Sequence, residues 1–454
     1  MDAFKQQLKD RLRLGCATLE LFDFAFDQAL IDGIFREHRG RCYTDSLSFP
    51  VLLSLVRDCL LQHKGSGHRL FQELERSDAA PVDESNFYRK LARMPVEVSR
   101  ALLRQCTARL TQLMAMPAVL LPACFEPFEA VVVDGKKIKR AAHRLAPTRG
   151  FSGALLGAKA LVAMNARSGL AVAMSDSLDG EANDVPLVGE LLPQVRGVIE
   201  KPILWMADRQ FCDARTLGRL RQRDGDHFVV RVREGLRFQA QTQRALRDDQ
   251  GRKVLDEVGV FGSGKHAMTL RRITLIRPGE EDVLLLSDLL DHQQFDAIDL
   301  LKLYRKRWGI ENLFQQVTET FALEHLIGCT PQAILFQFAL CLLMYNLIQV
   351  IKRYVAEDGN VDVSIVSTYG LFYDLKRELS TWAYLDAGPW TRCGFDQAQM
   401  RRRLRHLLKD SWDAVAYTKA SDKKPRKKKP PAQRLRGGHT SVQRILDGRV
   451  KVQL

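Results

Sequence analysis

The order of apolar segments between residues 126 and 232 constrains the fold more than any other feature of this sequence. Three strand-like segments come first, FEAVVVDGKKI, KALVAMN and LAVAMSD, and the turn-like ARSG joins the last two. A helical segment, the strand-like PILWMADRQF, a second helical segment and the strand-like HFVVRVR follow. This β-β-β-α-β-α-β order predicts a mixed α/β sheet with helices on its faces.

The segments on either side of this core predict the remaining organisation. Residues 1–125 read as helical, with apolar residues three or four apart in FPVLLSLVRDCLLQ and VEVSRALLRQCTARLTQLM. Between them lies the short basic segment DESNFYRKLARMP, which Asp83 or Ser85 would cap as a helix. A nucleic-acid contact and an ordinary solvated helix face are both compatible with that segment.

The predicted α/β domain spans residues 126–415 and contains one stretch of a different character. Residues from about 234 to 286 combine short alternating segments with turn formers such as FGSGK, which predicts a β-rich insertion. Residues 416–454 form a predicted basic tail that contains KKPRKKKPPAQRLRGG. This run cannot bury enough apolar surface to fold alone, so it either binds phosphates without sequence preference or serves solubility.

Charge and composition limit the partners. The chain has 69 Lys and Arg against 54 Asp and Glu, a net charge of +15, which favours nucleic acid or an anionic membrane surface as partner. Residues 333–351 are about as long as a membrane-spanning helix, but three polar residues, Gln337, Asn346 and Gln349, interrupt them. We therefore expect a buried core helix and no membrane. Nine cysteines without a C-x-x-C pair indicate reduced thiols and a cytoplasmic location.

Two of the predicted strands end in an acid, Asp134 in one and Asp208 in the other. In open α/β sheets the reactive crevice lies beyond the carboxyl ends of the strands, so both carboxylates would project into one crevice. Burying them there is costly unless a cation neutralises them, and their oxygens suit Mg²⁺ or Mn²⁺. An Asp after a strand is also commonly a turn former or helix cap, so neither acid is assigned by itself.

The segment YRKRWGIENLFQQVT predicts one helix with a polar and an apolar face. At about 100° per residue, Tyr304, Arg307 and Glu311 share one face, and Thr318 returns to it two turns later. The apolar stripe on the other side consists of Ile310, Leu313, Phe314 and Val317. We expect the polar face to look out of the core. Glu311 would supply a third acid, enough to hold two metal ions about 3.5–4 Å apart, the arrangement that supports in-line attack of a water or a 3′-hydroxyl on a phosphodiester.

These residues carry a resemblance to the insertion-sequence DDE transposases, specifically the insertion-sequence-four branch with the signature Y-x2-R-x3-E-x6-K. Tyr304, Arg307 and Glu311 fit that spacing. VVVDGKKI resembles the strand of the family's first Asp, and WMADRQF resembles the strand of its second. The β-rich insertion and the ending GGHTSVQRIL are also family features, and the resemblance covers roughly residues 30–445.

The resemblance implies an RNase H-like catalytic core and cut-and-paste movement of the element that encodes the protein. It implies that Asp134, Asp208 and Glu311 hold two Mg²⁺ or Mn²⁺ ions. It also implies that Tyr304 and Arg307 contact phosphates at the element's ends. The N-terminal helices would bind DNA, and the partners would be double-stranded DNA, as inverted-repeat ends and as target. A homodimer is expected in the DNA complex, because two ends must be joined.

One position departs from the signature, because its final lysine is Thr318 here. By the resemblance that lysine grips a DNA phosphate, so its loss should weaken end binding by about 1–3 kcal/mol and leave the metal chemistry in place. Changing Thr318 to Lys should then tighten binding. Arg305, Lys306 and Lys302 are candidates to compensate for the missing lysine. Trp308 would pack either against a base flipped out near the cut or into the protein core.

Three other functions stay open on sequence grounds. A catalytically impaired, transposase-derived DNA-binding protein would explain Thr318, but the intact spacing of the acids argues against it. A carbohydrate hydrolase with two carboxylates would explain the paired acids and not the basic tail. A simple metal-dependent nuclease would share the active site without needing domains that recognise DNA ends.

Overall fold

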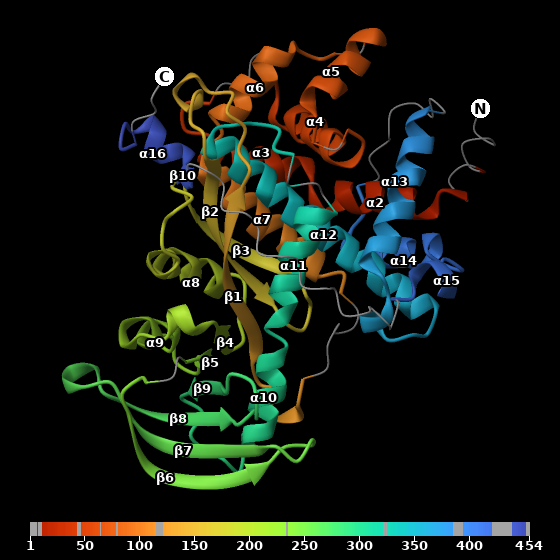
Figure 1. The fold of residues 1–454 in the computed structure, drawn as a ribbon. Coiled ribbons are helices and arrows are strands. Elements are labelled where there is room, and N and C mark those ends of the chain that lie inside the picture. The colour runs from red at the N-terminus through yellow and green to blue at the C-terminus, as the bar shows by residue number, and fades with distance from the viewer. Residues whose placement is uncertain are drawn as a thin grey trace.

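The structure is a computed structural model, and it describes residues 7, 11–42, 47–63, 65–78, 80–114, 121–232, 235–320, 323, 325–384, 394–419 and 438–450. Within these residues ten strands form one mixed sheet, and helices cover both of its faces (Figure 1). The predicted α/β class is therefore confirmed. The sheet order is β10-β2-β1-β4-β5-β9-β8-β7-β6, with β3 paired to β2.

The first five strands follow the predicted order. They are β1 (Glu129–Lys139), β2 (Ala154–Asn165), β3 (Ala171–Ser177), β4 (Ile203–Ala207) and β5 (His227–Arg231). Strand β2 runs antiparallel to β1 and β3, whereas β1, β4 and β5 are mutually parallel. Helix α8 (Val188–Arg196) connects β3 to β4, and α9 (Ala214–Leu220) connects β4 to β5. Both pack on one face of the sheet.

The predicted β-rich insertion extends the same sheet. It consists of β6 (Phe238–Arg247), β7 (Lys253–Phe261), β8 (Met268–Leu275) and β9 (Val283–Ser287). Strand β9 pairs antiparallel with β5, so the insertion continues the core sheet at that edge. The fully buried Arg271 donates two hydrogen bonds to Asp256, 2.7 and 2.9 Å long, and one to the carbonyl of Phe295. The insertion thereby holds the chain just before α10 (Ala297–Arg305).

The other face of the sheet is covered by α7 (Val96–Thr111), α11 (Trp308–Glu319) and α12 (Pro331–Asp358) (Figure 1). Helix α12 is long and apolar enough to cross a membrane, yet its apolar window is entirely buried in the fold, so the predicted core helix is confirmed. Two of its polar interruptions, Gln337 and Asn346, have partners there, and Gln337 bonds to Ile327 and His325. Asn346 bonds to both backbone groups of Ala171 in β3 and donates to Thr107 in α7.

The N-terminal residues are helical, as predicted. They form α2 (Arg13–Ala25), α3 (Gln28–His38), α4 (Phe49–Leu61), α5 (Gly67–Arg76) and α6 (Glu84–Ala92) before α7. Asp83 caps α6 by accepting a hydrogen bond from the Asn86 N–H. Arg100 of α7 forms an ion pair with the buried Asp176 of β3, and one apolar core runs from these helices to the sheet. The domain boundary near residue 125 stays a prediction.

The C-terminal elements pack beside α12 and, further on, return to the sheet. They are α13 (Thr368–Tyr384), α14 (Gln397–Leu407), α15 (Ala414–Tyr417), β10 (His439–Ser441) and α16 (Val442–Leu446). The basic run predicted as a loose tail falls mainly on residues 420–437, which lie outside the described residues. Strand β10 pairs in parallel with β2. Part of the segment 416–454 therefore belongs to the sheet, because Val442 and Ile445 behind β10 supply apolar surface that becomes buried.

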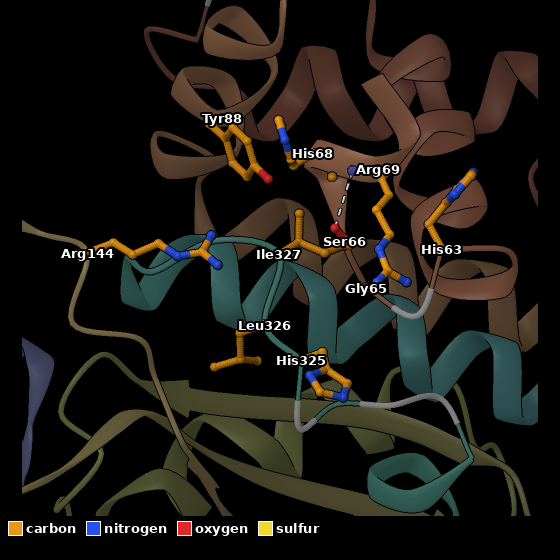
Figure 2. Close-up of a pocket in the computed structure, with 11 residues that line it drawn as sticks. His63, Gly65, Ser66, His68, Arg69, Tyr88, Arg144, His325, Leu326 and Ile327 are labelled. Atoms are coloured by element: carbon orange, nitrogen blue, oxygen red, sulfur yellow. Dashed lines mark hydrogen bonds between the residues drawn. The ribbon is translucent and has the colours of Figure 1, made fainter. Parts of the chain in front are cut away.

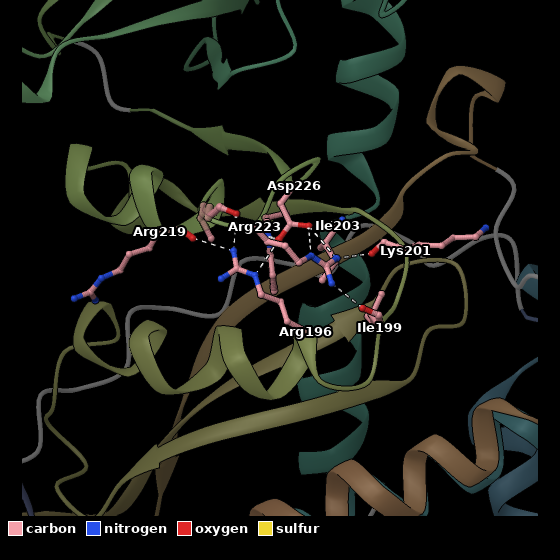
Figure 3. Close-up of polar contacts among 9 residues, drawn as sticks. Arg196, Ile199, Lys201, Ile203, Arg219, Arg223 and Asp226 are labelled. Carbon is pink, nitrogen blue, oxygen red and sulfur yellow. Dashed lines mark hydrogen bonds and ion pairs between the residues drawn. The ribbon is translucent and has the colours of Figure 1, made fainter.

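A buried acid joins the amino-terminal ends of β4 and β5 (Figure 3). Asp226 is 3% exposed and accepts hydrogen bonds from the Ile203 N–H at 2.8 Å and from Arg196 and Arg223 at 3.0 Å each. The indole of Trp205 approaches the same carboxylate at 3.4 Å. Arg196 belongs to α8, so this single carboxylate holds α8, β4 and β5 in register.

Candidate active site

The two aspartates lie at neighbouring strands, although not both at a strand end. Asp208 directly follows β4, as predicted. Asp134 lies inside β1, so the prediction that it ends its strand is wrong. The parallel pairing with β4 stops at Val133 and Ala207, whereas the longer partner β2 keeps β1 extended as far as Lys139. Asp134 is therefore the first residue of β1 beyond the end of its parallel neighbour β4. The carboxyls of Asp134 and Asp208 both lie at that end of the parallel strands.

The segment that we expected to be one helix is two, α10 and α11, which meet at Lys306 and Arg307. The prediction is wrong because the backbone tightens here: the Arg307 N–H donates three residues back, to Tyr304, at 3.0 Å. Gly309 follows this turn. A Cβ on Gly309 would lie 2.9 Å from the Met164 methyl of β2, so its absence lets the start of α11 approach the sheet closely.

Arg307 stands among the three predicted acids. Its guanidinium donates to Glu311 at 2.6 Å and lies 3.7 Å from the nearer Asp134 oxygen. Burial lowers the pKa of Arg307, but Tyr304, Glu311 and Asp208 together raise it above its ordinary value. The structure therefore brings Asp134, Asp208 and Glu311 into the electrostatic reach of one buried arginine.

Tyr304 and Arg307 are buried, so the expectation that they look out of the core is wrong. The Tyr304 hydroxyl donates to the carbonyl of Ala207, the last residue of β4, at 3.3 Å. Burial raises the pKa of Tyr304, which keeps the phenol neutral. The carboxylates around Arg307 provide the charge that makes its burial tolerable. In this structure Tyr304 positions α10 against β4, and Arg307 positions the start of α11 against Asp134 of β1.

Trp308 has the opposite environment. Its side chain is 60% exposed, so of the two roles expected for it, packing into the core is wrong. The guanidinium of Arg307 lies 5.7 Å from the centroid of its ring. Lys306 beside it is also exposed. An uncovered indole and an ammonium group therefore stand next to the acids.

Lys136 is a site residue that sequence reasoning missed. Its Nζ donates to the Thr318 hydroxyl at 2.9 Å and lies 5.5 Å from the centroid of the Phe314 ring. A signal was available, since strand side chains alternate and Lys136 must share the face of Asp134. Lys302, one expected substitute for the missing lysine, instead pairs with two other acids.

The acids carry more negative charge than Arg307 balances. Burial raises the pKa of Asp134 to about 6; Asp208 and Glu311 act in the same direction, while the Gly135 N–H and Arg307 lower it. The Nε of Arg307 is buried without a hydrogen-bond partner. Three carboxylates with surplus charge fit a hard divalent cation. Over the described residues, no three metal-binding side chains are already gathered closely enough to hold one.

Gly135 is required behind the acids. A Cβ at this position would lie 2.3 Å from a carboxylate oxygen of Asp184, which approaches the opposite face of β1. Asp184 is buried and forms an ion pair with Lys159 of β2 at 2.6 Å. Asp134 and Asp184 therefore lie on opposite sides of β1. Asp184 is paired with Lys159, whereas Asp134 faces Arg307.

A second concave site lies where the N-terminal helices meet the loop before α12 (Figure 2). Its cavity of about 430 Å³ is lined mainly by basic and aromatic side chains, including His68, Arg69, Tyr88, Arg144 and His325. Tyr88 comes from the segment DESNFYRKLARMP. The cationic lining is compatible with the DNA contact expected of these helices, which stays a prediction.

Residues 126–347 match the model of the transposase DDE domain family. The match covers just under half of the chain and contains Asp134, Asp208 and Glu311. The core of this chain is thus similar to transposase catalytic domains.

Two curated proteins are similar over part of their length. A protein of Synechocystis sp., described as a transposase for insertion sequence element IS4SA, is 21% identical over 147 residues, 32% of this chain and 40% of that protein. A protein of Sinorhizobium fredii, described as transposase y4zB, is 25% identical over 132 residues, 28% of this chain and 36% of that protein. The chain thus spans about two fifths of the length of the curated relatives it matches.

A solved structure, the piggyBac transposase synaptic complex with hairpin DNA, aligns with 88% of this chain and 87% of its own, at 13% identity. Its TM-score is 0.42.

Proposed function

We propose that this protein is a DNA transposase that cuts and rejoins the phosphodiester strands of its own insertion element. The finer assignment is to the insertion-sequence-four branch, with an RNase H-like core formed by β1 to β5 and their helices. The family match over the core supports the general reaction, and the fit of Tyr304, Arg307 and Glu311 to the signature supports the branch.

One observation carries the proposal. Asp134 in β1, Asp208 after β4 and Glu311 in α11 come from distant parts of the chain, yet all three act on the buried Arg307. Natural proteins rarely gather three carboxylates around one arginine for stability alone, because the uncompensated charge costs free energy. The arrangement suits a site that receives cations and phosphates.

Asp134, Asp208 and Glu311 would hold two Mg²⁺ or Mn²⁺ ions, which would activate a water or 3′-hydroxyl and stabilise the leaving oxygen. Arg307 keeps these carboxylates together before DNA arrives. Its planar guanidinium also has the fork geometry that binds phosphate oxygens once the carboxylates have other partners. Tyr304 holds Arg307 at the end of β4 through its bond to Ala207.

The exposed groups around the acids would contact DNA. Trp308 offers an uncovered ring on which a base unstacked near the cut would pack, and Lys306 offers a charge for a backbone phosphate. The N-terminal helices and the basic run before β10 would add contacts to the inverted-repeat ends. We expect a homodimer in the DNA complex and a cytoplasmic location.

The second candidate is a transposase-derived DNA-binding protein with impaired chemistry, motivated by Thr318 in place of a lysine. An excision assay separates the two. A marker would be placed between the DNA repeats that flank the gene, and purified protein would be added with Mg²⁺. We expect excision by the wild type.

The acid substitutions Asp134→Asn, Asp208→Asn and Glu311→Gln should each lower cleavage at least about 100-fold, the loss typical of removing one electrostatic group at a reacting centre. Binding to the repeats should persist. Glu319→Gln is the matched control, because Glu319 lies on the exposed side of the same helix. Cleavage retained by any of the three would remove that acid from the site. Binding of the repeats without excision by the wild type would favour the second candidate.

A further inference from the structure

We propose that Lys136 is a phosphate-binding residue, held in place by Thr318 and aimed at the DNA strand that enters the acid site. The proposal rests on the proposed transposase function, and it adds a residue and a contact that neither the signature nor the family match assigns. It also gives the unexpected Thr318 a role.

The position of Lys136 follows from the strand. Lys136 is two residues after Asp134, so the two side chains leave the same face of β1, with their Cα atoms about 7 Å apart. That face is the one covered by α11, whose Thr318 lies two turns beyond Glu311. A cation therefore stands on the same face of β1 as Asp134, where a phosphate of a strand bound at the acids would pass.

Thr318 forms a tether for the ammonium group. Its hydroxyl donates to the carbonyl of Phe314 in its own helix at 2.7 Å, so its lone pairs remain free to accept. The Nζ of Lys136 donates to that oxygen at 2.9 Å, with the Phe314 ring near its charge. These contacts fix the direction of a side chain that otherwise loses considerable entropy on binding.

Lys136 forms no direct ion pair with a carboxylate within the described residues, although Asp134 attracts its charge from a longer distance. Its ammonium has three donors, and Thr318 takes one of them. The side chain is half-buried, so part of it stays accessible to a ligand. Most other half-buried cations near the sheet, such as Arg100 and Arg196, are already neutralised by an acid. Lys136 is thus a pre-positioned, unneutralised cation beside a predicted phosphodiester site.

A lysine at position 318 would replace the hydroxyl that holds Lys136. Its side chain would start beside the Nζ of Lys136, and two like charges that close together repel. The structure thus revises the sequence-based expectation that Thr318→Lys tightens DNA binding. Alone, that change should leave affinity unchanged or lower it. Combined with removal of the Lys136 charge, it should restore a cation at the same spot.

The experiment compares the wild type with K136M, T318K and the double variant K136M/T318K. The probe is a duplex of the repeat DNA that flanks the gene, without metal, and the dissociation constant is measured at several salt concentrations. Methionine keeps the apolar stem, so packing on Phe314 is largely retained. K137M is the matched control, because Lys137 is the exposed neighbour on the opposite face of β1.

We expect K136M to weaken binding roughly 10-fold or more, the loss of one charge-assisted contact. The slope of log affinity against log salt should fall by about 1, which is the signature of one lost phosphate contact. The double variant should recover most of both quantities. K137M should change the affinity by less than about 3-fold. T318V, which removes the tether and keeps the charge, should weaken binding less and leave the slope unchanged.

Equal affinity and equal slope for K136M and the wild type would overturn the proposal, as would equal losses in K136M and K137M. Failure of the double variant to recover would show that position 318 does not adjoin the phosphate contact, and would also overturn it. These outcomes are distinct from failure of the proposed function, in which the wild type neither prefers the repeat duplex over a scrambled one nor excises the marker. A folding defect in K136M would be visible as a lower melting temperature, and T318V and the double variant would then decide.

Discussion

Two clusters of acids and arginines stand at opposite ends of β4, and they are balanced in opposite ways. At the amino-terminal end, one carboxylate, Asp226, meets two arginines and a backbone N–H. At the carboxyl-terminal end, three carboxylates share one buried arginine, Arg307. The same residue types thus form a satisfied structural tie at one end and a site with surplus negative charge at the other.

The difference shows that the cluster at the carboxyl-terminal end of β4 is arranged at a cost in folding stability. Buried polar groups in a structural role have all their partners, as Asp226 does. At the other end burial raises the pKa of Asp134, and the Nε of Arg307 has no partner. Perturbed groups of this kind concentrate at functional sites, where a ligand supplies the missing charge. Measuring how each cluster affects the free energy of unfolding tests this contrast.

The largest effect is expected at the satisfied cluster. Asp226→Asn should lower the free energy of unfolding by about 3–5 kcal/mol, because Arg196 and Arg223 would keep their charges against a neutral amide. Chemical denaturation measures this directly. Asp224→Asn is the control, since Asp224 is exposed nearby and should shift stability by less than about 0.5 kcal/mol. A loss for Asp226→Asn as small as that of the control would mean that this cluster contributes little.

A smaller effect of opposite sign is expected at the acid site. The folded-state pKa of Asp134 is about 6, above its ordinary 3.8, so between these values the folded protein binds the proton more tightly than the unfolded chain. Stability of the wild type should therefore fall as pH rises from about 4 to 6. Asp134→Asn removes this dependence.

In a chelating buffer at pH 8, Asp134→Asn should raise the free energy of unfolding on the order of 1–3 kcal/mol. The gain should vanish at about pH 3, below both pKa values of Asp134, where the wild-type carboxyl is protonated in both states. Denaturation at the two pH values tests this sign. A variant less stable than the wild type at pH 8 would show that the Asp134 charge is compensated after all.

The smallest effect is expected from the metal ion. Mg²⁺ at ten times its dissociation constant should stabilise the wild type by about 1.4 kcal/mol, seen as a rise in melting temperature at pH 8. Asp134→Asn should show little of this rise, whereas Asp224→Asn should show all of it. Equal rises in all three proteins would place the metal ion elsewhere.

Local patterns predicted much of the fold. The order of β1 to β5, the β-rich insertion, the Asp83 cap of α6 and the burial of α12 all follow from apolar periodicity and capping residues, which act over a few residues. The three acids were also singled out from the sequence, Asp208 by its place after a strand and Glu311 by its spacing from Tyr304 and Arg307, and their catalytic role stays a prediction. Their convergence was an inference from sheet geometry, and the structure brings them around Arg307.

Contacts between distant segments could not be predicted in the same way. The division into α10 and α11 depends on how closely Gly309 approaches Met164 of β2. The burial of Tyr304 depends on the carbonyl of Ala207. A helical wheel predicts on which face of a helix a side chain lies, but not which part of the protein packs on that face. The polar face with Tyr304 and Arg307 was therefore wrongly predicted to be exposed to solvent.

Hydrophobic period and turn chemistry are local, so the chain's own patterns predict which segments become strands and helices. The sharing of charge among their residues depends on how those segments pack. Lys136 and Thr318 are 182 positions apart, and no pattern along the chain pairs them. Their contact exists because α11 packs across β1, and electrostatic pairing is set by distance in space, which only the packing of the sheet and its helices creates.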